Sequence, residues 1–335
     1  MTQRARHDPQ EYLGSLETLE RAAAVVYRAM SPTPQFMWPL LCEALGTQVW
    51  AKHENHTPLG AFKVRGGLVY FDNLARARDK PLGVISATRG NHGQSVAFAA
   101  ARAGLPATVV VPYGNSSEKN AAMRALGAEL IEHGDDFQAA REHATSLASE
   151  RGLLMVPSFH PLLVQGVASY ALELMRAVTD LDAIYVPIGL GSGICGMIAA
   201  REALGHKAEI IGVVSDRAPA YALSCEAHRH IEHAATNVLS DGMACRTPEH
   251  DALEILWRHA NRVVRVSERE VAQAMRLLFT ATHNVAEGAG AAPLAAALQE
   301  RDRLRGRKVA VVVSGGNVDR AVFAEVLTAA ADATL

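Results

Sequence analysis

Short runs of apolar residues alternate along the chain with longer segments in which apolar side chains recur at helical spacing. The short runs are bounded by glycine, proline or polar residues, which is typical of buried strands. Candidate strands occupy residues 47–54, 83–88, 107–112, 128–133, 153–157, 183–188, 209–214, 262–267 and 308–314. The intervening segments, such as residues 91–104 and 118–127, are rich in alanine and contain leucine, arginine or glutamate, which favours helices.

This alternation of strands and helices predicts an α/β fold in which parallel, twisted sheets are covered by helices on both faces. No repeat or low-complexity linker separates two independent domains, so we expect two interleaved lobes. The large lobe is predicted to comprise residues 1–79 and 158–335, and the small lobe residues 80–157. The last candidate strand is followed by only one short helical segment, so we expect no C-terminal regulatory domain.

Composition narrows the possible classes of function. Hydrophobic residues make up 49% of the 335 residues and charged residues 20%, enough for a large core and against disorder. The net charge of −2 and the absence of a long basic run argue against nucleic-acid binding. The four cysteines are scattered, the first residues contain no apolar stretch, and no apolar run reaches the ~18 residues of a membrane helix. We therefore expect a reduced, cytoplasmic protein without membrane segments.

The first of four loops with candidate chemistry covers residues 54–67. A turn at Pro58 and Gly60 leads into a helix that begins near Ala61, which places Lys63 in the first helical turn. The helix dipole disfavours a cation there, and a lysine with a lowered pKa suits covalent catalysis. The alternative is a surface lysine beside Arg65.

The second loop covers residues 86–97, where a strand ends at Thr88 and a helix starts near Asn91. Backbone N–H groups at such a helix start bind carboxylates, and Thr88, Asn91 and His92 offer further hydrogen bonds. An ordinary turn in which Asn91 caps the helix is the alternative.

The third loop follows the strand at residues 183–188 and contains four glycines. Gly191, Gly193 and Gly196 fit the G-x-G-x-x-G pattern, and Asp216 ends the next strand, as in dinucleotide-binding proteins. The same loop would suit any phosphorylated cofactor at a helix N-terminus. This stretch alone leaves both possibilities open.

The fourth loop covers residues 311–319, where a buried strand stops at Ser314 and two glycines follow. Ser314 can hydrogen-bond a ligand at the carboxyl edge of the sheet, whereas Asn317 could simply cap the next helix. All four loops follow the carboxyl ends of candidate strands, so we expect them to converge on one site. The histidines at 228, 230 and 233 do not share a helical face, and we interpret them as a solvated helix surface.

Together the loops resemble the serine/threonine dehydratases, pyridoxal-5′-phosphate enzymes of fold type II, the fold of tryptophan synthase β. The resemblance extends from about residue 20 to 325. It implies a Schiff base on Lys63 with Phe62 beside the ring, Asn91 at the cofactor's 3′-oxygen, and Ser314 at the pyridine nitrogen. It implies that the cofactor phosphate is held by Gly189, Leu190, Gly191, Ser192 and Gly193. It also implies that the substrate carboxylate lies against Thr88, Arg89, Gly90, Asn91 and His92.

The resemblance implies a homodimer that converts a 3-hydroxy amino acid to a 2-oxo acid and ammonia. Departures from the family pattern include Leu59 and Ala61 before the lysine and Arg89 in the carboxylate loop. Val213 lies near the place of a metal-ligating acid in metal-activated relatives, so no metal site is expected. Arg89 favours a bulkier substrate such as a phenylserine, or an acidic one such as 3-hydroxyaspartate. An amino-acid racemase, an NAD-dependent oxidoreductase and an inactive binding protein are the alternatives.

Overall fold

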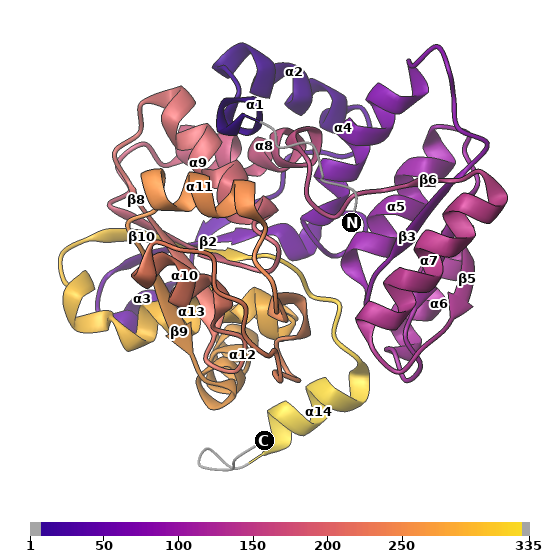
Figure 1. The fold of residues 1–335 in the computed structure, drawn as a ribbon. Helices are drawn as coiled ribbons and strands as arrows, with labels where there is room; N and C mark the ends of the chain where they lie inside the picture. Colours follow the sequence, from indigo (N-terminus) through magenta and orange to yellow (C-terminus); the bar gives the residue numbers. More distant parts are fainter. Residues whose placement is uncertain (1–7, 330–335) are drawn as a thin grey trace.

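The computed structural model describes residues 8–329 and divides the strands between two sheets (Figure 1). The larger sheet has the order β1-β2-β10-β7-β8-β9, and every neighbouring pair is parallel except β1 and β2. Its strands are β1 (Gln35–Met37), β2 (Gln48–His53), β7 (Ala183–Pro187), β8 (Glu209–Ser215), β9 (Arg262–Val266) and β10 (Lys308–Val313). The prediction of parallel sheets is confirmed.

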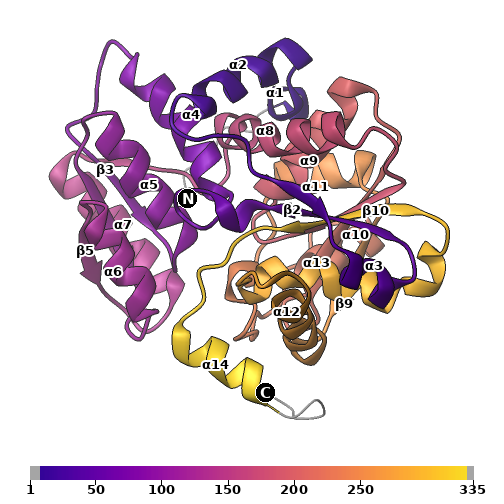
Figure 2. The same ribbon diagram turned by 180° about the vertical axis from the view of Figure 1, so that it is seen from behind.

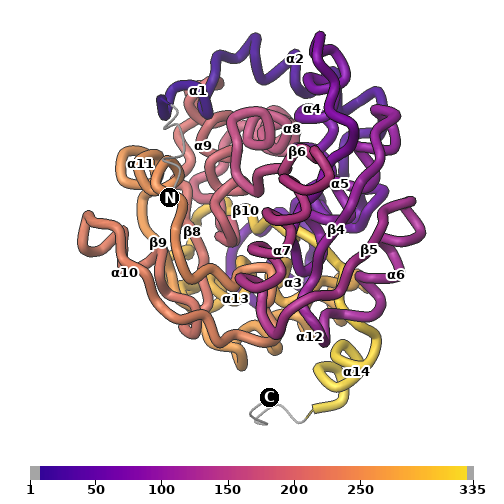
Figure 3. Tube along the Cα trace, turned by 45° about the vertical axis from the view of Figure 1, so that its right-hand side comes forward, coloured from indigo at the N-terminus to yellow at the C-terminus, as the bar shows by residue number. Residues whose placement is uncertain are grey.

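The smaller sheet is parallel throughout and has the order β5-β4-β3-β6. Its strands are β3 (Val84–Ala87), β4 (Ala107–Val111), β5 (Glu129–Glu132) and β6 (Leu154–Met155). Figure 3 shows that this sheet and its helices lie beside the larger sheet. The exact lobe boundaries stay a prediction.

Helices fill most of the segments between the strands. They are α1 (Pro9–Leu13), α2 (Leu16–Tyr27), α3 (Pro39–Leu45), α4 (Lys63–Ala75), α5 (Asn91–Arg102), α6 (Ser117–Ala125), α7 (Phe137–Arg151), α8 (Pro161–Ala177), α9 (Ser192–Leu204), α10 (Ala220–Ala227), α11 (His250–His259), α12 (Glu268–Thr282), α13 (Gly288–Gln299) and α14 (Arg320–Thr328). Single 3₁₀ turns are η1 (Glu54–His56), η2 (Asp241–Met243) and η3 (Arg301–Leu304). No helix within residues 8–329 is long and apolar enough to cross a membrane.

The inner strands β7, β8 and β10 of the larger sheet are buried on both faces, which explains why they are nearly continuous apolar runs. In β7, Ile184 belongs to a core formed with α8 and α9, whereas Tyr185 belongs to a core formed with α12 and α13. Figure 1 shows α8 and α9 on one side of this sheet and α12 and α13 on the other. Alternate residues of one strand therefore serve two separate cores.

Helix α4 lies between α8 and α5, and so joins the two sheets. Two adjacent glycines allow this close packing. A Cβ atom at Gly66 would lie 2.7 Å from the carbonyl oxygen of Leu163, and one at Gly67 would lie 2.2 Å from Ser95 Oγ. The first residue of α4, Lys63, is thereby held at the boundary between the two sheets.

The segment after β10 returns to the smaller sheet and ends in α14, as seen from behind in Figure 2. The backbone N–H of Arg320 donates to Glu118 Oε1 at 3.0 Å, and Ser116 is hydrogen-bonded to Asp319. Both contacts tie the C-terminal segment to the start of α6.

Candidate active site

One cavity lies where the carboxyl ends of β2, β3, β7 and β10 face one another across the two sheets. All the predicted site residues line it: Phe62, Lys63, Thr88, Arg89, Gly90, Asn91, His92, Gly189, Leu190, Gly191, Ser192, Gly193 and Ser314. The four loops therefore converge as their positions after strands predicted.

Lys63 is the first residue of α4, and its side chain is half-buried in this cavity. Its amine donates to Ser192 Oγ at 3.0 Å, and burial lowers its pKa to about 8 because water no longer stabilises the charge. Arg65 is fully buried. The alternative interpretation of Lys63 as a surface lysine beside Arg65 is therefore wrong. An amine with this pKa is partly neutral near pH 8, as nucleophilic attack requires.

Two loops hold the backbone around Lys63. The N–H of Phe62 donates to the carbonyl of Ser314 at 3.0 Å, and Ala61 forms a β-bridge with Gly315. The Phe62 ring centre lies 5.0 Å from Lys63 Nζ. The lysine and the serine at the end of β10 are thus fixed relative to each other through the main chain.

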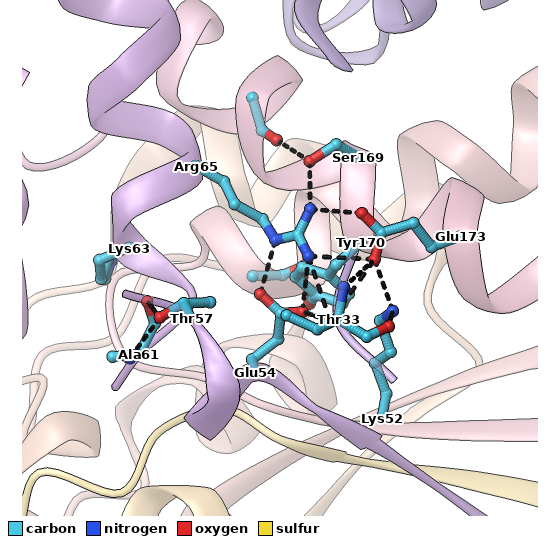
Figure 4. Close-up of polar contacts among 12 residues, drawn as sticks. Thr33, Lys52, Glu54, Thr57, Ala61, Lys63, Arg65, Ser169, Tyr170 and Glu173 are labelled. Atoms are coloured by element: carbon cyan, nitrogen blue, oxygen red, sulfur yellow. Dashed lines mark hydrogen bonds and ion pairs between the residues drawn. The ribbon is translucent and has the colours of Figure 1, made fainter. Parts of the chain in front are cut away.

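A buried ionic cluster anchors α4 on the side away from the cavity (Figure 4). Arg65 Nε donates to Glu54 Oε2 at 2.7 Å, and Arg65 Nη1 donates to Glu173 Oε1 at 2.6 Å. Glu173 also accepts from Lys52 Nζ at 2.6 Å. Two cations and two carboxylates therefore balance one another where β2, α4 and α8 meet, and Figure 4 shows Lys63 directed away from them.

The orientation of the Asn91 amide is fixed by two neighbours. Its Nδ2 donates to Glu287 Oε1 at 2.7 Å, and its Oδ1 accepts from Asn317 Nδ2 at 2.8 Å. Within residues 8–329 the second N–H of Nδ2 has no recorded partner, so it can donate to a ligand oxygen. Asn317 therefore does not cap the following helix, whose N-cap is Asp319.

Sequence reasoning missed three charged residues in the cavity. Glu287 is buried, and its Oε2 has no hydrogen bond to any residue between 8 and 329. Burial together with Asp241 raises the pKa of Glu287 to about 7, although Lys119 opposes the shift. Lys119 Nζ lies 2.8 Å from Asp241 Oδ2 and 3.9 Å from Glu287 Oε2. These residues come from α6, η2 and the loop before α13, so no local motif could have connected them.

The loop from Gly189 to Gly193 forms the start of α9. A Cβ atom at Gly189 would lie 2.5 Å from the Gly242 carbonyl oxygen, and Gly191 has a φ of +102°. The close packing at Gly189 and the backbone conformation at Gly191 therefore require glycine whether or not a ligand binds. At Gly193 a Cβ atom would lie 3.6 Å from the Phe62 ring, an ordinary contact distance, so packing does not require glycine there. Free N–H groups at the start of α9, beside the cavity that this loop lines, fit a phosphate group.

The loop from Thr88 to His92 lies at the start of α5. The N–H of Gly90 donates to Thr88 Oγ1 at 3.1 Å, and a Cβ atom at Gly90 would lie 2.6 Å from Lys119 Cδ. Burial and the nearby Lys63 lower the pKa of His92 to about 3, which keeps it neutral. Arg89 is exposed at the cavity, and no ion pair to it is recorded within residues 8–329.

The histidines at 228, 230 and 233 do not form a helix surface as predicted. Helix α10 ends at Ala227, and His228 has left-handed backbone geometry with a φ of +46°. His230 and His233 lie in the irregular segment that follows, where His230 Nε2 is hydrogen-bonded to the Pro248 carbonyl at 2.8 Å. Within the described part of the chain, no group of three or more potential ligands is placed to hold a metal.

A lysine lies at the start of α4, a glycine loop at the start of α9, and a serine directly after the last strand, β10. These three features define a pyridoxal-phosphate enzyme of fold type II. The sequence model of the family described as "Pyridoxal-phosphate dependent enzyme" matches residues 26–315. The chain belongs to this family, within the serine/threonine dehydratase group. This overturns the dinucleotide interpretation of the glycine loop and the NAD-dependent oxidoreductase alternative.

Three similar proteins illustrate the relationship. The L-threonine ammonia-lyase of Thermotoga maritima is 33% identical over 306 residues, which are 91% of this chain and 76% of that protein. The crystal structure of a threonine deaminase from T.th. has a TM-score of 0.85 at 33% identity, covering 91% of this chain and 99% of that one. A pyridoxal 5′-phosphate-dependent aspartate racemase has a TM-score of 0.86 at 26% identity, covering 91% and 96%.

Proposed function

We propose that this protein is a carbon–oxygen lyase that dehydrates a 3-hydroxy amino acid and releases a 2-oxo acid and ammonia. The observation that carries the proposal is Lys63, a half-buried amine with a pKa of about 8 beside Ser192 in the shared cavity. The similarity to threonine ammonia-lyases and threonine deaminase supports the same reaction.

Each loop then has one role toward pyridoxal phosphate. Lys63 would be the covalent attachment point, with Phe62 beside it. Residues 189–193 would hold the phosphate, the N–H of Asn91 would donate to the 3′-oxygen, and the hydroxyl of Ser314 would bind the pyridine nitrogen. The cofactor, when bound, supplies an electron-withdrawing ring that takes up the electron pair left at the α-carbon.

Substrate binding and proton transfer fall to the chain's own residues. The loop of residues 88–92 binds the α-carboxylate through N–H groups at the start of α5. With the amino acid held at the cofactor, the amine of Lys63 would accept the α-proton. The Cβ–O bond would then break, and the hydroxyl would leave as water that overall contains this proton. The released enamine tautomerises and takes up water to give the 2-oxo acid and ammonia.

Arg89 supports a substrate larger or more acidic than serine. Its guanidinium is exposed at the cavity, whose lining also includes the apolar residues Phe137 and Met243. A cation over an aryl ring contributes roughly 0.5–2 kcal/mol, and pairing with a second carboxylate would also select the substrate. We therefore propose phenylserine or 3-hydroxyaspartate as preferred substrates. Racemisation is the alternative, but a guanidinium offers only hydrogen-bond donors, so Arg89 is not suited to act as the base on the face opposite Lys63.

Two further proposals concern assembly and location. Phe36, Met37 and Leu40 are large apolar residues exposed near the edge strand β1, which supports a homodimer formed through this edge. The four cysteines are free, which supports a reducing, cytoplasmic location.

The first experiment identifies the attachment point and the reaction. Borohydride reduction followed by peptide mapping should place the cofactor on Lys63, and each of serine, threonine, phenylserine and 3-hydroxyaspartate is assayed for 2-oxo acid and ammonia release. Cofactor fixed on another lysine, or no release from any of the four, would refute the proposal.

The substrate preference is tested by comparing kcat/KM for the four amino acids in the wild type, Arg89→Ala and Arg102→Ala. Arg102 is the last residue of α5, the helix that starts just after Arg89, and serves as the control because it does not line the cavity. We expect Arg89→Ala, but not Arg102→Ala, to lower kcat/KM for phenylserine or 3-hydroxyaspartate several-fold relative to serine. Unchanged kcat/KM ratios in Arg89→Ala would show that Arg89 does not select the substrate.

A further inference from the structure

Two buried tyrosines that are not among the residues lining the cavity contact the glycine loop. The hydroxyl of Tyr221, on α10, donates to the carbonyl oxygen of Leu190 at 2.9 Å. The hydroxyl of Tyr170, on α8, donates to the carbonyl oxygen of Gly193 at 3.2 Å. Each tyrosine is 1% exposed, so neither hydroxyl exchanges this partner for water.

The direction of the Tyr221 hydrogen bond is set by a third group. The backbone N–H of Glu249 donates to the Tyr221 oxygen at 3.1 Å, so the single hydroxyl proton of Tyr221 goes to Leu190. The same oxygen would lie 3.2 Å from a Cβ atom at Gly191. Tyr221 therefore packs directly against the sharpest part of the loop, where φ is +102°.

Holding these carbonyls outward directs the loop's N–H groups inward. In a trans peptide the C=O and the N–H point in opposite directions. With the Leu190 carbonyl held toward Tyr221, the Gly191 N–H points to the cavity. The Gly193 carbonyl held by Tyr170 likewise fixes the peptide whose N–H belongs to Ile194. The Gly191 N–H belongs to the residues that the proposed function assigns to the cofactor phosphate, and the Ile194 N–H directly follows them.

We propose that Tyr221, assisted by Tyr170, is a positioning residue that orients the N–H groups of the phosphate-binding loop. The inference rests on the proposed function, because it assumes that residues 189–193 hold the phosphate. Tyr170 also links the loop to the lysine segment, since its ring stacks edge-on against Phe62 at 6.2 Å between centres and lies 5.9 Å from the Arg65 guanidinium.

The test compares the affinity of the full-length apoenzyme for pyridoxal phosphate with its affinity for pyridoxal, which lacks the phosphate. In Tyr221→Phe we expect the Kd of pyridoxal phosphate to rise about three- to tenfold, as for one lost hydrogen bond. The Kd of pyridoxal should stay within twofold. Tyr170→Phe should show the same selective loss, and it provides a second test if Tyr221→Phe folds poorly.

Tyr185→Phe is the matched control. Tyr185 is a fully buried tyrosine in β7 whose hydroxyl donates to Glu300 at 2.7 Å, away from the loop. It should lower stability without changing the ratio of the two affinities. An equal effect of Tyr221→Phe on both ligands, or the same change of ratio in Tyr185→Phe, would overturn the inference.

A fourth variant, Gly193→Asp, tests the assumption about the loop. A carboxylate there suits the first turn of α9 but repels a phosphate, so pyridoxal phosphate affinity should fall at least tenfold. No change would mean that the loop does not hold the phosphate, and the proposed role of residues 189–193 fails. A loss in Gly193→Asp with none in the tyrosine variants would overturn the tyrosine inference alone.

Discussion

Replacing Arg65 by methionine should destabilise the protein severely, because Arg65 is the centre of the buried ionic cluster. Methionine fills much of the same volume but carries no charge. Glu54 would lose hydrogen bonds of 2.7 and 2.9 Å from the guanidinium and Glu173 would lose those of 2.6 and 3.0 Å. Glu173 would keep Lys52, whereas Glu54 would keep only the hydroxyl of Thr33.

The size of the effect follows from this charge balance. The intact cluster is neutral, with two cations and two carboxylates, and removing one cation leaves one uncompensated negative charge in the core. Breaking a buried pair in this way costs about 3–5 kcal/mol, a large share of the ~5–15 kcal/mol by which proteins are typically stable. Arg76→Met, at the end of the same helix, removes an exposed pair with Asp72 and should cost less than about 1 kcal/mol.

Urea unfolding of the apoenzyme, followed by circular dichroism, measures the difference between the two variants. The double variant Arg65→Met/Glu54→Gln removes one charge of each sign, and we expect it to recover at least about 1 kcal/mol relative to Arg65→Met. If Arg65→Met costs no more than Arg76→Met, or if the double variant is less stable than Arg65→Met, the electrostatic reasoning is refuted.

Three further changes test the cavity. Lys63→Ala should abolish turnover and covalent attachment, and borohydride labelling at wild-type level would contradict this. Ser314→Asp should favour a protonated pyridine and so raise α-hydrogen exchange relative to elimination. An unchanged ratio of the two in deuterated water would show that Ser314 is not at the ring nitrogen. Glu287 has its pKa raised to about 7, so its contribution to stability is present at low pH and is lost as pH rises through about 7. The apoenzyme's thermal midpoint should therefore fall between pH 5 and 8, and less so in Glu287→Gln. An equal fall in both would exclude Glu287 as the cause.

The sequence contains enough information to predict nine strands and the loops that follow them. Buried strands such as β7 and β10 are continuous apolar runs, and helix starts near Lys63 and Asn91 follow from adjacent glycine and proline turns. Strand β1 is not predicted because Gln35–Met37 is only three residues long and partly exposed, so it has no apolar run.

The charged part of the site is not predictable in the same way. Lys119, Asp241 and Glu287 are separated by long stretches of sequence, and each is an ordinary surface residue type when considered alone. Their proximity depends on how the smaller sheet packs against the larger one. From the sequence, Arg65 is only a neighbour of Lys63. The helical repeat of 3.6 residues shows that the two side chains point in different directions, but it does not show that Arg65 meets two buried carboxylates.

The position of β10 has a consequence for how the protein matures during synthesis. This strand is the last in the described chain, yet it pairs with β2 on one side and β7 on the other. Until β10 leaves the ribosome, the strand that lies between β2 and β7 in the larger sheet is missing. The N–H of Phe62 then also lacks its acceptor, the carbonyl of Ser314. Lys63 can therefore leave the ribosome and lie in a helix long before the residues that surround it in the folded protein have been synthesised. We expect cofactor capture to follow translation of nearly the whole chain, so nascent chains stalled before residue 308 should not retain pyridoxal phosphate.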